Sequence, residues 1–202
     1  MASSPAQRVL RLPPANLAGI KLPRTGQPAR NWFRVHQTQF AATCFSLNTI
    51  HRYSHKDCPY PFLYLRVDAE TCLFERFGDL AYDHKRAVPQ SIWCAHSLSL
   101  VRVPDLVICD LTSPRTLSAL MVDLSALMHT RVDAPQAWGL ALQRHPANFQ
   151  GLKFRSRFNG KVCLALFRRD GLEKRVKEKK LNTLPNDDAA VDWLAKHKVS
   201  LY

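Results

Sequence analysis

Five side chains that lie far apart in the sequence are of types that can bind anions and stabilise a developing positive charge. Arg34 and Arg52 carry planar guanidinium groups, which can grip the paired oxygens of a pyrophosphate with two hydrogen bonds. Glu75 supplies a carboxylate, which can stabilise positive charge on a sugar when a glycosidic bond breaks. Tyr64 offers a ring for stacking, and the Ser156 hydroxyl can fix a phosphate or ribose oxygen.

Two strand-like segments and a helix carry three of these residues. Residues 32–36 alternate as in a strand around Arg34, and residues 61–67, rich in aromatic and branched side chains, form a second strand candidate that contains Tyr64. Asp68 is well placed to cap a following helix, and Glu75 falls off its apolar stripe. Both strands end near polar residues, which we expect to line a cleft. The stripe consists of Ala69, Cys72, Leu73, Phe77 and Leu80.

The rest of the chain mixes strands and helices without regular alternation. Strand-like runs occupy residues 98–103, 106–111 and 162–167, and the last is almost wholly apolar, which is typical of a central buried strand. Helical patterns occupy residues 113–128, 134–144 and 187–198, and the mixed-charge run 168–180 is typical of a solvated helix face. The pattern predicts an α+β fold, a single compact domain with a mixed central sheet.

Together, the segments around these side chains resemble the RES domain family. The resemblance rests on Arg34, residues 52–54, the strand 63–65 that leads to Glu75, and the segment 151–157. Residues 106–112 and 137–138 extend it over most of the stretch from 34 to 167. The loop departs from the family pattern at two places: many members have glycine or asparagine where His51 stands, and asparagine where Ser54 stands.

The resemblance implies a body similar in shape to the ADP-ribosyltransferases, with a cleft that accepts NAD. Characterised members of the family are bacterial toxins of toxin–antitoxin systems that destroy NAD. The implied enzyme is a hydrolase or a glycosyltransferase, namely an NAD glycohydrolase or NAD phosphorylase, that uses NAD as substrate and needs no cofactor or metal. The implied catalytic residues are Glu75, Arg34 and Ser156, and the implied substrate-binding residues are Arg52, Tyr53 and Tyr64.

The resemblance also assigns a task to each group. Glu75 would stabilise the ribosyl cation, Arg34 and Arg52 would hold the pyrophosphate, and Tyr64 would pack on the nicotinamide side. Ser156 would fix the dinucleotide or the group that accepts the ADP-ribose. The partner implied by the family is a cognate antitoxin that carries an Xre-like helix-turn-helix region and plugs the cleft.

Two other functions stay open at this point, and so does export of the protein as an effector. One is a protein mono-ADP-ribosyltransferase on the same fold, because the acceptor of the ADP-ribose can be water, phosphate or a protein side chain. The other is a catalytically inactive basic protein that binds nucleic acid, since a formal net charge of +13 attracts polyanions. The missing aromatic base-stacking motif argues against direct nucleic-acid binding.

Zinc ligation is a further alternative. His51, His55 and Cys58, joined by Cys44, could be arranged as ligands. Structural zinc sites usually present paired cysteine or histidine hooks in two places, whereas the sequence contains only this one loose cluster. We therefore expect no metal site.

The chain divides into two parts by composition. Residues 1–30 form a predicted proline-rich, basic N-terminal arm without any acidic residue, and residues 31–202 form the RES-like NAD-binding domain, including the C-terminal helical segment. The six cysteines include no Cys-x-x-Cys pair and stand in apolar surroundings, so we expect reduced, buried thiols. Neither a signal peptide nor a membrane span is supported, and we expect a cytoplasmic protein without membrane contact.

Overall fold

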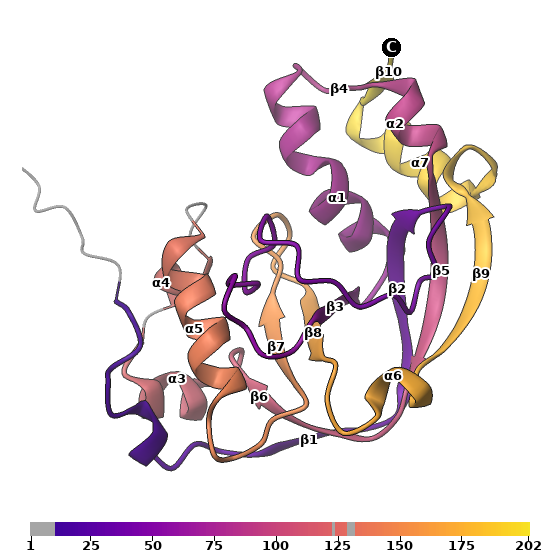
Figure 1. Ribbon diagram of the computed structural model, residues 1–202. Helices are drawn as coiled ribbons and strands as arrows, with labels where there is room; N and C mark the ends of the chain where they lie inside the picture. Colours follow the sequence, from indigo (N-terminus) through magenta and orange to yellow (C-terminus); the bar gives the residue numbers. More distant parts are fainter. Residues whose placement is uncertain (1–10, 123, 129–131) are drawn as a thin grey trace, which may run out of the picture.

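A mixed β-sheet of eight strands organises the chain (Figure 1). The computed structural model describes residues 11–122, 124–128 and 132–202, so the first ten residues of the expected arm lie outside the described residues. In chain order the elements are η1 (Leu17–Gly19), β1 (Thr25–Gln27), β2 (Arg30–Gln37), β3 (Phe62–Arg66), α1 (Ala69–Asp83), β4 (Ala87–Val88), α2 (Gln90–Cys94), β5 (His96–Val103), β6 (Leu106–Asp110), α3 (Pro114–Leu120), α4 (Leu124–Met128), α5 (Asp133–Gln143), β7 (Gly151–Arg155), β8 (Val162–Phe167), α6 (Leu172–Arg175), β9 (Lys177–Thr183), η2 (Leu184–Asn186), α7 (Asp188–His197) and β10 (Ser200–Leu201).

The strand order of the large sheet is β1-β6-β7-β8-β3-β2-β5-β9, and the sheet curls strongly along this order (Figure 1). Among its described strands, β6 and β7 run parallel and every other neighbouring pair is antiparallel. The short strands β4 and β10 form a separate parallel pair. The expected α+β fold with a mixed central sheet is confirmed.

The centre of the sheet is apolar on both faces. Strand β8 lies between β7 and β3, and residues 163–167 are fully buried, as expected of a central strand. In β3, Phe62 and Tyr64 face the hydrophobic core that contains Trp138 of α5, whereas Leu63 and Leu65 face a second core on the other side. This alternation follows from the two-residue period of a strand and gives each face of β3 its own partners.

The helices lie in two groups. Helices α3, α4 and α5 pack beside β6 and β7, and α1, α2 and α7 gather at the opposite end of the sheet near β2 and β5 (Figure 1). Helix α1 buries Cys72, Leu73 and Phe77 of its predicted stripe against this end. The Asp68 side chain accepts a hydrogen bond of 2.8 Å from the backbone N–H of Thr71, so the predicted cap is confirmed.

Two predicted helices take a different form. The helix expected over residues 113–128 is divided into α3 and α4, with Met121 in the left-handed region at φ 49°. The mixed-charge run 168–180 does not form a solvated helix, because it contains only the short α6 and then enters the edge strand β9. Lysine is a common residue on exposed edge strands, where its charge discourages pairing with another chain, so the charge pattern alone does not distinguish the two structures.

Residues 11–30 contact the body of the molecule. Leu17 and Leu22 are buried in the core that contains Trp138, and β1 pairs with β6, with Thr25 opposite Ile108. The domain boundary expected at residue 30 stays a prediction.

Two further expectations concern the state of the cysteines and the presence of a membrane-spanning helix. All six cysteines are free thiols in the described part of the chain, but Cys44 and Cys94 are exposed rather than buried. Among the described residues, none of the helices has both the length and the hydropathy needed to cross a bilayer.

Replacement of the α1 cap provides a test of this local structure. We expect Asp68→Ala to lower the free energy of unfolding by about 1 kcal/mol, because the N–H groups of the first turn lose their side-chain acceptor. Asp83→Ala, at the other end of α1, is the matched control, and it should leave stability unchanged or slightly raised because an acid is unfavourable at a helix C-terminus. Urea unfolding of both variants measures the difference, and equal losses would contradict the capping role.

Candidate active site

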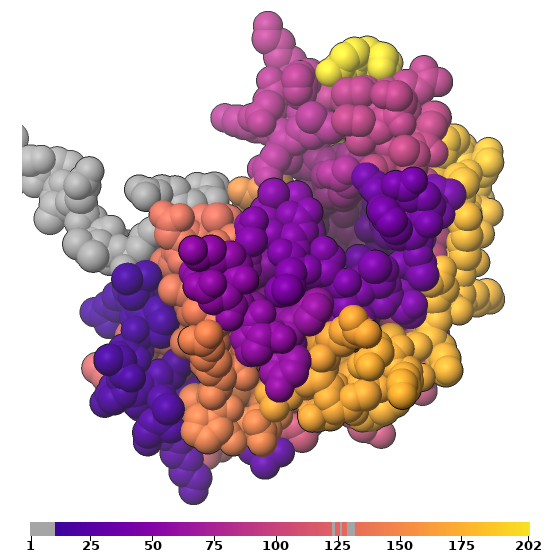
Figure 2. All heavy atoms as spheres, viewed as in Figure 1, coloured from indigo at the N-terminus to yellow at the C-terminus, as the bar shows by residue number. Residues whose placement is uncertain are grey.

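The candidate site forms where the large sheet opens. Strand β2 pairs with β5 from Arg30 to Gln37, but it pairs with β3 at one position, Phe33 opposite Arg66. Beyond that pair the two strands separate. Figure 2 shows the molecular surface hollowed beside the loop that follows β2, between this loop and the helices α1 and α2. Helix α1 carries Glu75 and begins at Ala69, three residues after β3 ends at Arg66.

Glu75 is held inside the site rather than facing bulk solvent. Its side chain is 11% exposed, and Oε1 accepts a hydrogen bond of 2.7 Å from Ser156 Oγ. Oε2 lies 3.5 Å from Nη2 of Arg66, whose side chain is 13% exposed. The structure therefore brings Glu75 and Ser156 together, although they stand 81 positions apart in the chain.

The charges around Glu75 keep its carboxyl group ionised. Burial by itself raises the pKa of Glu75, but the attraction of Arg66, the hydrogen bond from Ser156 and the nearby Arg52 and Arg157 guanidinium groups outweigh burial and lower this pKa below its ordinary value of 4.5. At neutral pH the group is a carboxylate. It is thus a fixed negative charge that is already oriented before any ligand arrives.

Arg66 is the residue that the sequence reasoning missed. It follows Tyr64 by two positions in β3, and side chains at that spacing point to the same face of a strand. The guanidinium carbon lies 5.7 Å from the centre of the Tyr64 ring. The alternation around Tyr64 would have revealed Arg66, because the two residues share one strand and one face.

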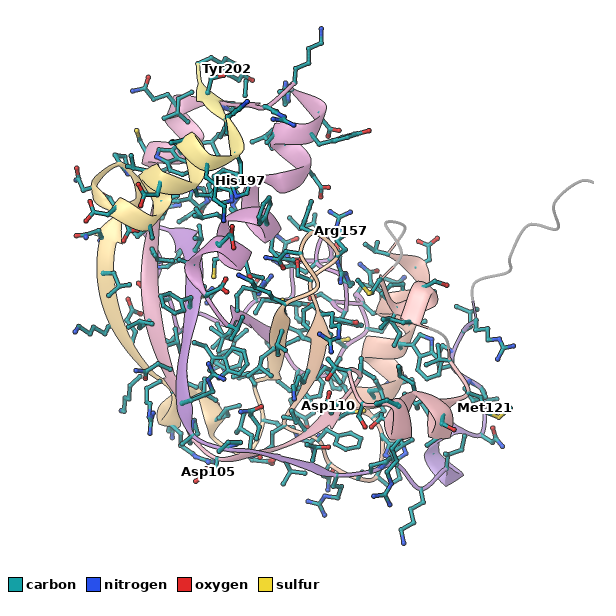
Figure 3. All side chains as sticks on the ribbon, turned by 180° about the vertical axis from the view of Figure 1, so that it is seen from behind. Asp105, Asp110, Met121, Arg157, His197 and Tyr202 are labelled. Atoms are coloured by element: carbon teal, nitrogen blue, oxygen red, sulfur yellow. The ribbon has the colours of Figure 1, made fainter. Side chains whose placement is uncertain are left out.

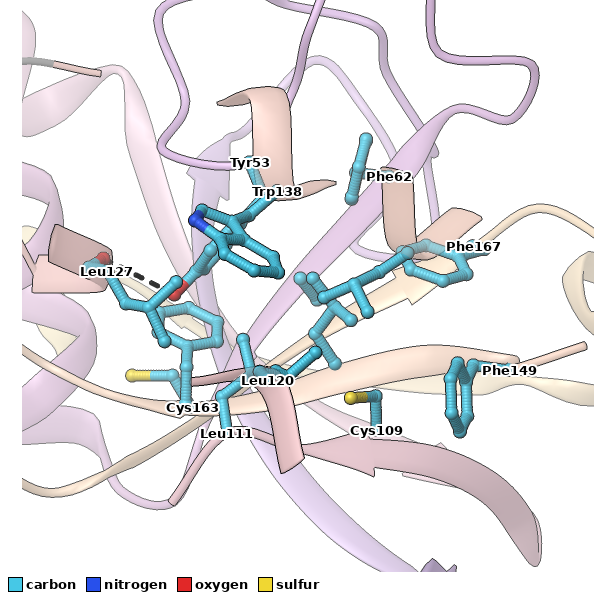
Figure 4. Packing of buried hydrophobic residues seen from close by; sticks show 14 of the residues in the cluster. Tyr53, Phe62, Cys109, Leu111, Leu120, Leu127, Trp138, Phe149, Cys163 and Phe167 are labelled. Atoms are coloured by element: carbon cyan, nitrogen blue, oxygen red, sulfur yellow. Dashed lines mark hydrogen bonds between the residues drawn. The ribbon is translucent and has the colours of Figure 1, made fainter. Parts of the chain in front are cut away.

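Tyr64 and Tyr53 have different surroundings. The Tyr64 hydroxyl accepts a hydrogen bond of 3.1 Å from the backbone N–H of Tyr53 and lies 3.1 Å from Ser54 Oγ, so it fixes the loop 51–54. The Tyr53 side chain is 1% exposed, and its hydroxyl donates to the carbonyl of Leu127 in the core (Figure 4). Tyr53 thus anchors this loop to the core, and its contact with substrate stays a prediction. The serine at position 54 supplies a hydroxyl for Tyr64.

The two arginines expected to bind phosphates are partly occupied by the protein itself. Arg34 Nη1 donates to the carbonyl oxygens of Ala42 at 2.6 Å and Cys44 at 2.8 Å, which holds the loop after β2. Burial is the main cause that lowers the pKa of Arg34 to about 10, so the group stays charged at pH 7. Arg52 Nη1 donates to the carbonyl of Arg155 at 3.1 Å. The positive charge of Arg52 helps to lower the pKa of Glu75. Arg34 instead is close enough to Arg66 for the two positive charges to repel each other.

His51 adds a neutral ring to the site. The ring centre lies 4.9 Å from that of Tyr64. More than a third of the residue is exposed, but the ring loses water against its neighbours, and this desolvation together with Arg66 and Arg34 lowers the pKa of His51 to about 4. The histidine is therefore uncharged at neutral pH and adds no further positive charge to the arginines.

Ser156 is fully buried at the turn between β7 and β8. Its Oγ donates to Glu75 and accepts a hydrogen bond of 3.2 Å from the backbone N–H of Phe158. The backbone N–H of Ser156 donates to the carbonyl of Lys161 at 2.8 Å, which closes the turn. These bonds hold the Ser156 hydroxyl against the Glu75 carboxylate.

The alternative of a zinc site finds no support in the geometry. Within the part of the chain that the structure describes, no three His, Cys, Asp or Glu side chains gather in a way that could hold a metal ion. His55 Nδ1 instead lies 3.6 Å from Asp57, in the turn that follows the loop.

Arg66→Met tests the charge balance of the site. We expect the pKa of Glu75 to rise, because burial continues to oppose its charge after the attraction of Arg66 is lost. We also expect the free energy of unfolding at pH 7 to fall by up to about 3 kcal/mol. In the wild type, the Glu75 contribution to stability is present above pH 4.5 and is lost as the pH falls through the lowered pKa. A carbon-detected NMR titration of the Glu75 carboxyl group measures the shift.

The double variant Arg66→Met/Glu75→Met is the control for the Arg66→Met experiment. It removes both buried charges, so it should be more stable than Arg66→Met alone. An unchanged carboxyl pKa in Arg66→Met would show that Arg66 does not set the charge of Glu75.

Comparisons with known proteins agree with the fold. The search of curated proteins gave no match. Among solved structures, the fold is similar to the crystal structure of the M. tuberculosis MbcT–MbcA toxin–antitoxin complex, with a TM-score of 0.61 and 18% sequence identity over 85% of this chain and 92% of that chain. A family model described as the RES domain matches residues 31–190. Because this match covers well over half of the sequence, the chain belongs to the RES domain family.

Proposed function

We propose that this RES domain protein is a toxin that cleaves the bond between nicotinamide and ribose in NAD and thereby depletes cellular NAD. The observation that carries the proposal is the Ser156–Glu75–Arg66 arrangement, with its hydrogen bond of 2.7 Å and its ion pair of 3.5 Å. The similarity to a toxin of a toxin–antitoxin complex supports the biological role. The family resemblance supports the choice of NAD.

The charge of the site suits this reaction. When nicotinamide leaves, positive charge develops on the ribose, and an oriented carboxylate such as Glu75 stabilises it without reorganisation at the moment of reaction. The donors around Glu75 are guanidinium and hydroxyl groups, which keep it ionised. The carboxylate can then accept a hydrogen bond from a ribose hydroxyl while it faces the sugar.

The other residues take supporting tasks in the proposed reaction. The N–H groups of Arg52 and Arg34 that do not contact protein carbonyls are candidates to bind the pyrophosphate, since planar guanidinium groups suit paired anionic oxygens. Tyr64 and the neutral His51 ring supply the aromatic side of the site for nicotinamide. Water or inorganic phosphate then accepts the ADP-ribose.

We further propose a partner protein that neutralises the toxin. The solved structure with the similar fold is a complex of a toxin with its antitoxin. The net charge of +13 favours association with an acidic inhibitor segment, since opposite charge speeds encounter. The resemblance suggests an Xre-like antitoxin with a helix-turn-helix region.

Glu75→Gln tests the proposed chemistry. The amide has the same shape and can still accept from Ser156, but it lacks the charge that stabilises the ribosyl cation. We expect nicotinamide release from NAD to fall by about 10²-fold or more. Glu173→Gln on α6 is the matched control and should keep the wild-type rate.

The same assay distinguishes the remaining candidate functions. Product analysis with and without phosphate distinguishes ADP-ribose from its phosphorylated form, and so identifies the acceptor. Transfer of ADP-ribose to added protein would favour the transferase. Absence of nicotinamide release from the wild type, together with salt-sensitive DNA binding, would overturn the proposal and favour a nucleic-acid-binding protein.

Ser156→Ala tests the positioning role of the serine. Loss of its hydrogen bond raises the pKa of Glu75, so the acid limb of the pH–rate profile should move to higher pH than in the wild type. The wild-type rate should hold from neutral pH down to pH 4.5 and fall only below it, because the carboxyl pKa is lowered in the folded protein. An unshifted acid limb with a reduced rate would instead indicate that Ser156 acts on the substrate and not through Glu75.

A further inference from the structure

A cavity of about 510 Å³ lies between α1, α7 and the turn that joins β7 to β8. Arg34, Arg52, Tyr64, Glu75 and Ser156 do not line it. In Figure 3, His197 near the end of α7 and Arg157 in the β7–β8 turn mark two sides of this region. The cavity is therefore distinct from the candidate active site, although α1 contributes to both.

The walls of the cavity are aromatic. Phe74 and Phe158 lie nearly parallel, with ring centres 6.1 Å apart, and Trp193 stands edge-on to Phe74 at 5.4 Å. His197 approaches Phe74 at 4.7 Å. Gly78 completes the wall where a larger side chain would not fit, since a β-carbon there would lie 2.5 Å from the Phe158 ring. Such walls favour a flat, apolar ring.

The rim of the cavity carries uncompensated positive charge. Lys196 is paired with Glu70 at 2.7 Å, and Asp79 is paired with Arg157, so these charges are balanced. Arg86 and Lys198 also line the cavity, and neither has a carboxylate partner among the described residues. The two cations come from different elements, the turn after α1 and the end of α7.

We propose that this cavity binds a small aromatic or heteroaromatic anion, in which a flat ring carries a carboxylate or a phosphate. The ring lies among Phe74, Phe158 and Trp193, and the anionic group is held by Arg86 and Lys198. Guanidinium and ammonium groups suit both acids. The volume of the cavity lies within the range of about 300–1,000 Å³ that is usual for small-molecule sites. The proposal does not depend on NAD cleavage.

The cavity lies next to the turn that carries Ser156. Phe158 forms one wall, and its backbone N–H donates to Ser156 Oγ at 3.2 Å. Ser156 in turn donates to Glu75. A ligand in the cavity therefore contacts the same turn that positions the candidate catalytic carboxylate.

Isothermal titration calorimetry on the full chain tests the proposal. Indole-3-acetate probes a ring with a carboxylate, and AMP probes a ring with a phosphate, so the two arms distinguish the sources of the anion. The uncharged rings indole and adenosine are the ligand controls. We expect at least one anionic probe to bind saturably, and to bind about tenfold or more tightly than its uncharged counterpart.

Two variants locate the binding. Arg86→Gln/Lys198→Gln removes the free cations of the rim, and Gly78→Ala displaces the Phe158 ring while it improves the helix propensity of α1. We expect each to weaken binding about tenfold or more. The matched control is Lys21→Gln/Arg24→Gln, which removes the same charge from the segment between η1 and β1, at the far end of the molecule (Figure 1).

The outcomes separate this proposal from the proposed function. Binding of a probe that is lost in the rim variant and kept in the control supports the cavity as a site, whether or not NAD is cleaved. Absence of saturable binding of both probes up to about 1 mM overturns it. Equal weakening in the rim variant and the control also overturns it, since that result would indicate a general effect of net charge. A thermal melt of each variant confirms that it is folded.

Discussion

The candidate site depends on one buried carboxylate that is kept charged. Taking Glu75 out of water is costly, and the structure offsets this cost with Arg66, Ser156 and the more distant Arg52. These partners come from a strand, a turn and a loop, so α1, β3 and the β7–β8 turn must be in their native places together for the charge to be tolerated. The same constraint fixes where Glu75 points. Fold and candidate chemistry are thus linked through a single ion pair and a single hydrogen bond.

The large sheet opens between β2 and β3, next to the strand that carries Arg66. Because the two strands pair only at Phe33 and Arg66, the sheet divides into two halves that share this junction. Arg34 follows Phe33 in β2 and ties the loop 42–44 to its side of the opening. The loop 51–54 is tied to the opposite side by Tyr64.

Local patterns predicted much of this architecture. The alternation in β3, the apolar run of β8 and the cap at Asp68 depend on neighbouring residues, and the structure follows them. Met121, which is exposed and left-handed, ends α3 before α4 begins, and the apolar pattern of residues 113–128 does not indicate this break. For the site, the family motifs identified Glu75 and Ser156 but did not predict the hydrogen bond between them. The contacts of Arg34 with carbonyl oxygens follow from the path of a loop, which the sequence does not encode in a short motif.

The two edges of the large sheet limit how the molecule can associate with others. One edge is the three-residue β1, too short to template an incoming strand, and the other is β9, where Lys177, Lys179 and Lys180 are exposed. A second copy that approached β9 would align like charges along the new ladder, and a basic segment would be repelled in the same way. Growth of the sheet into fibrils or edge-paired dimers is therefore disfavoured.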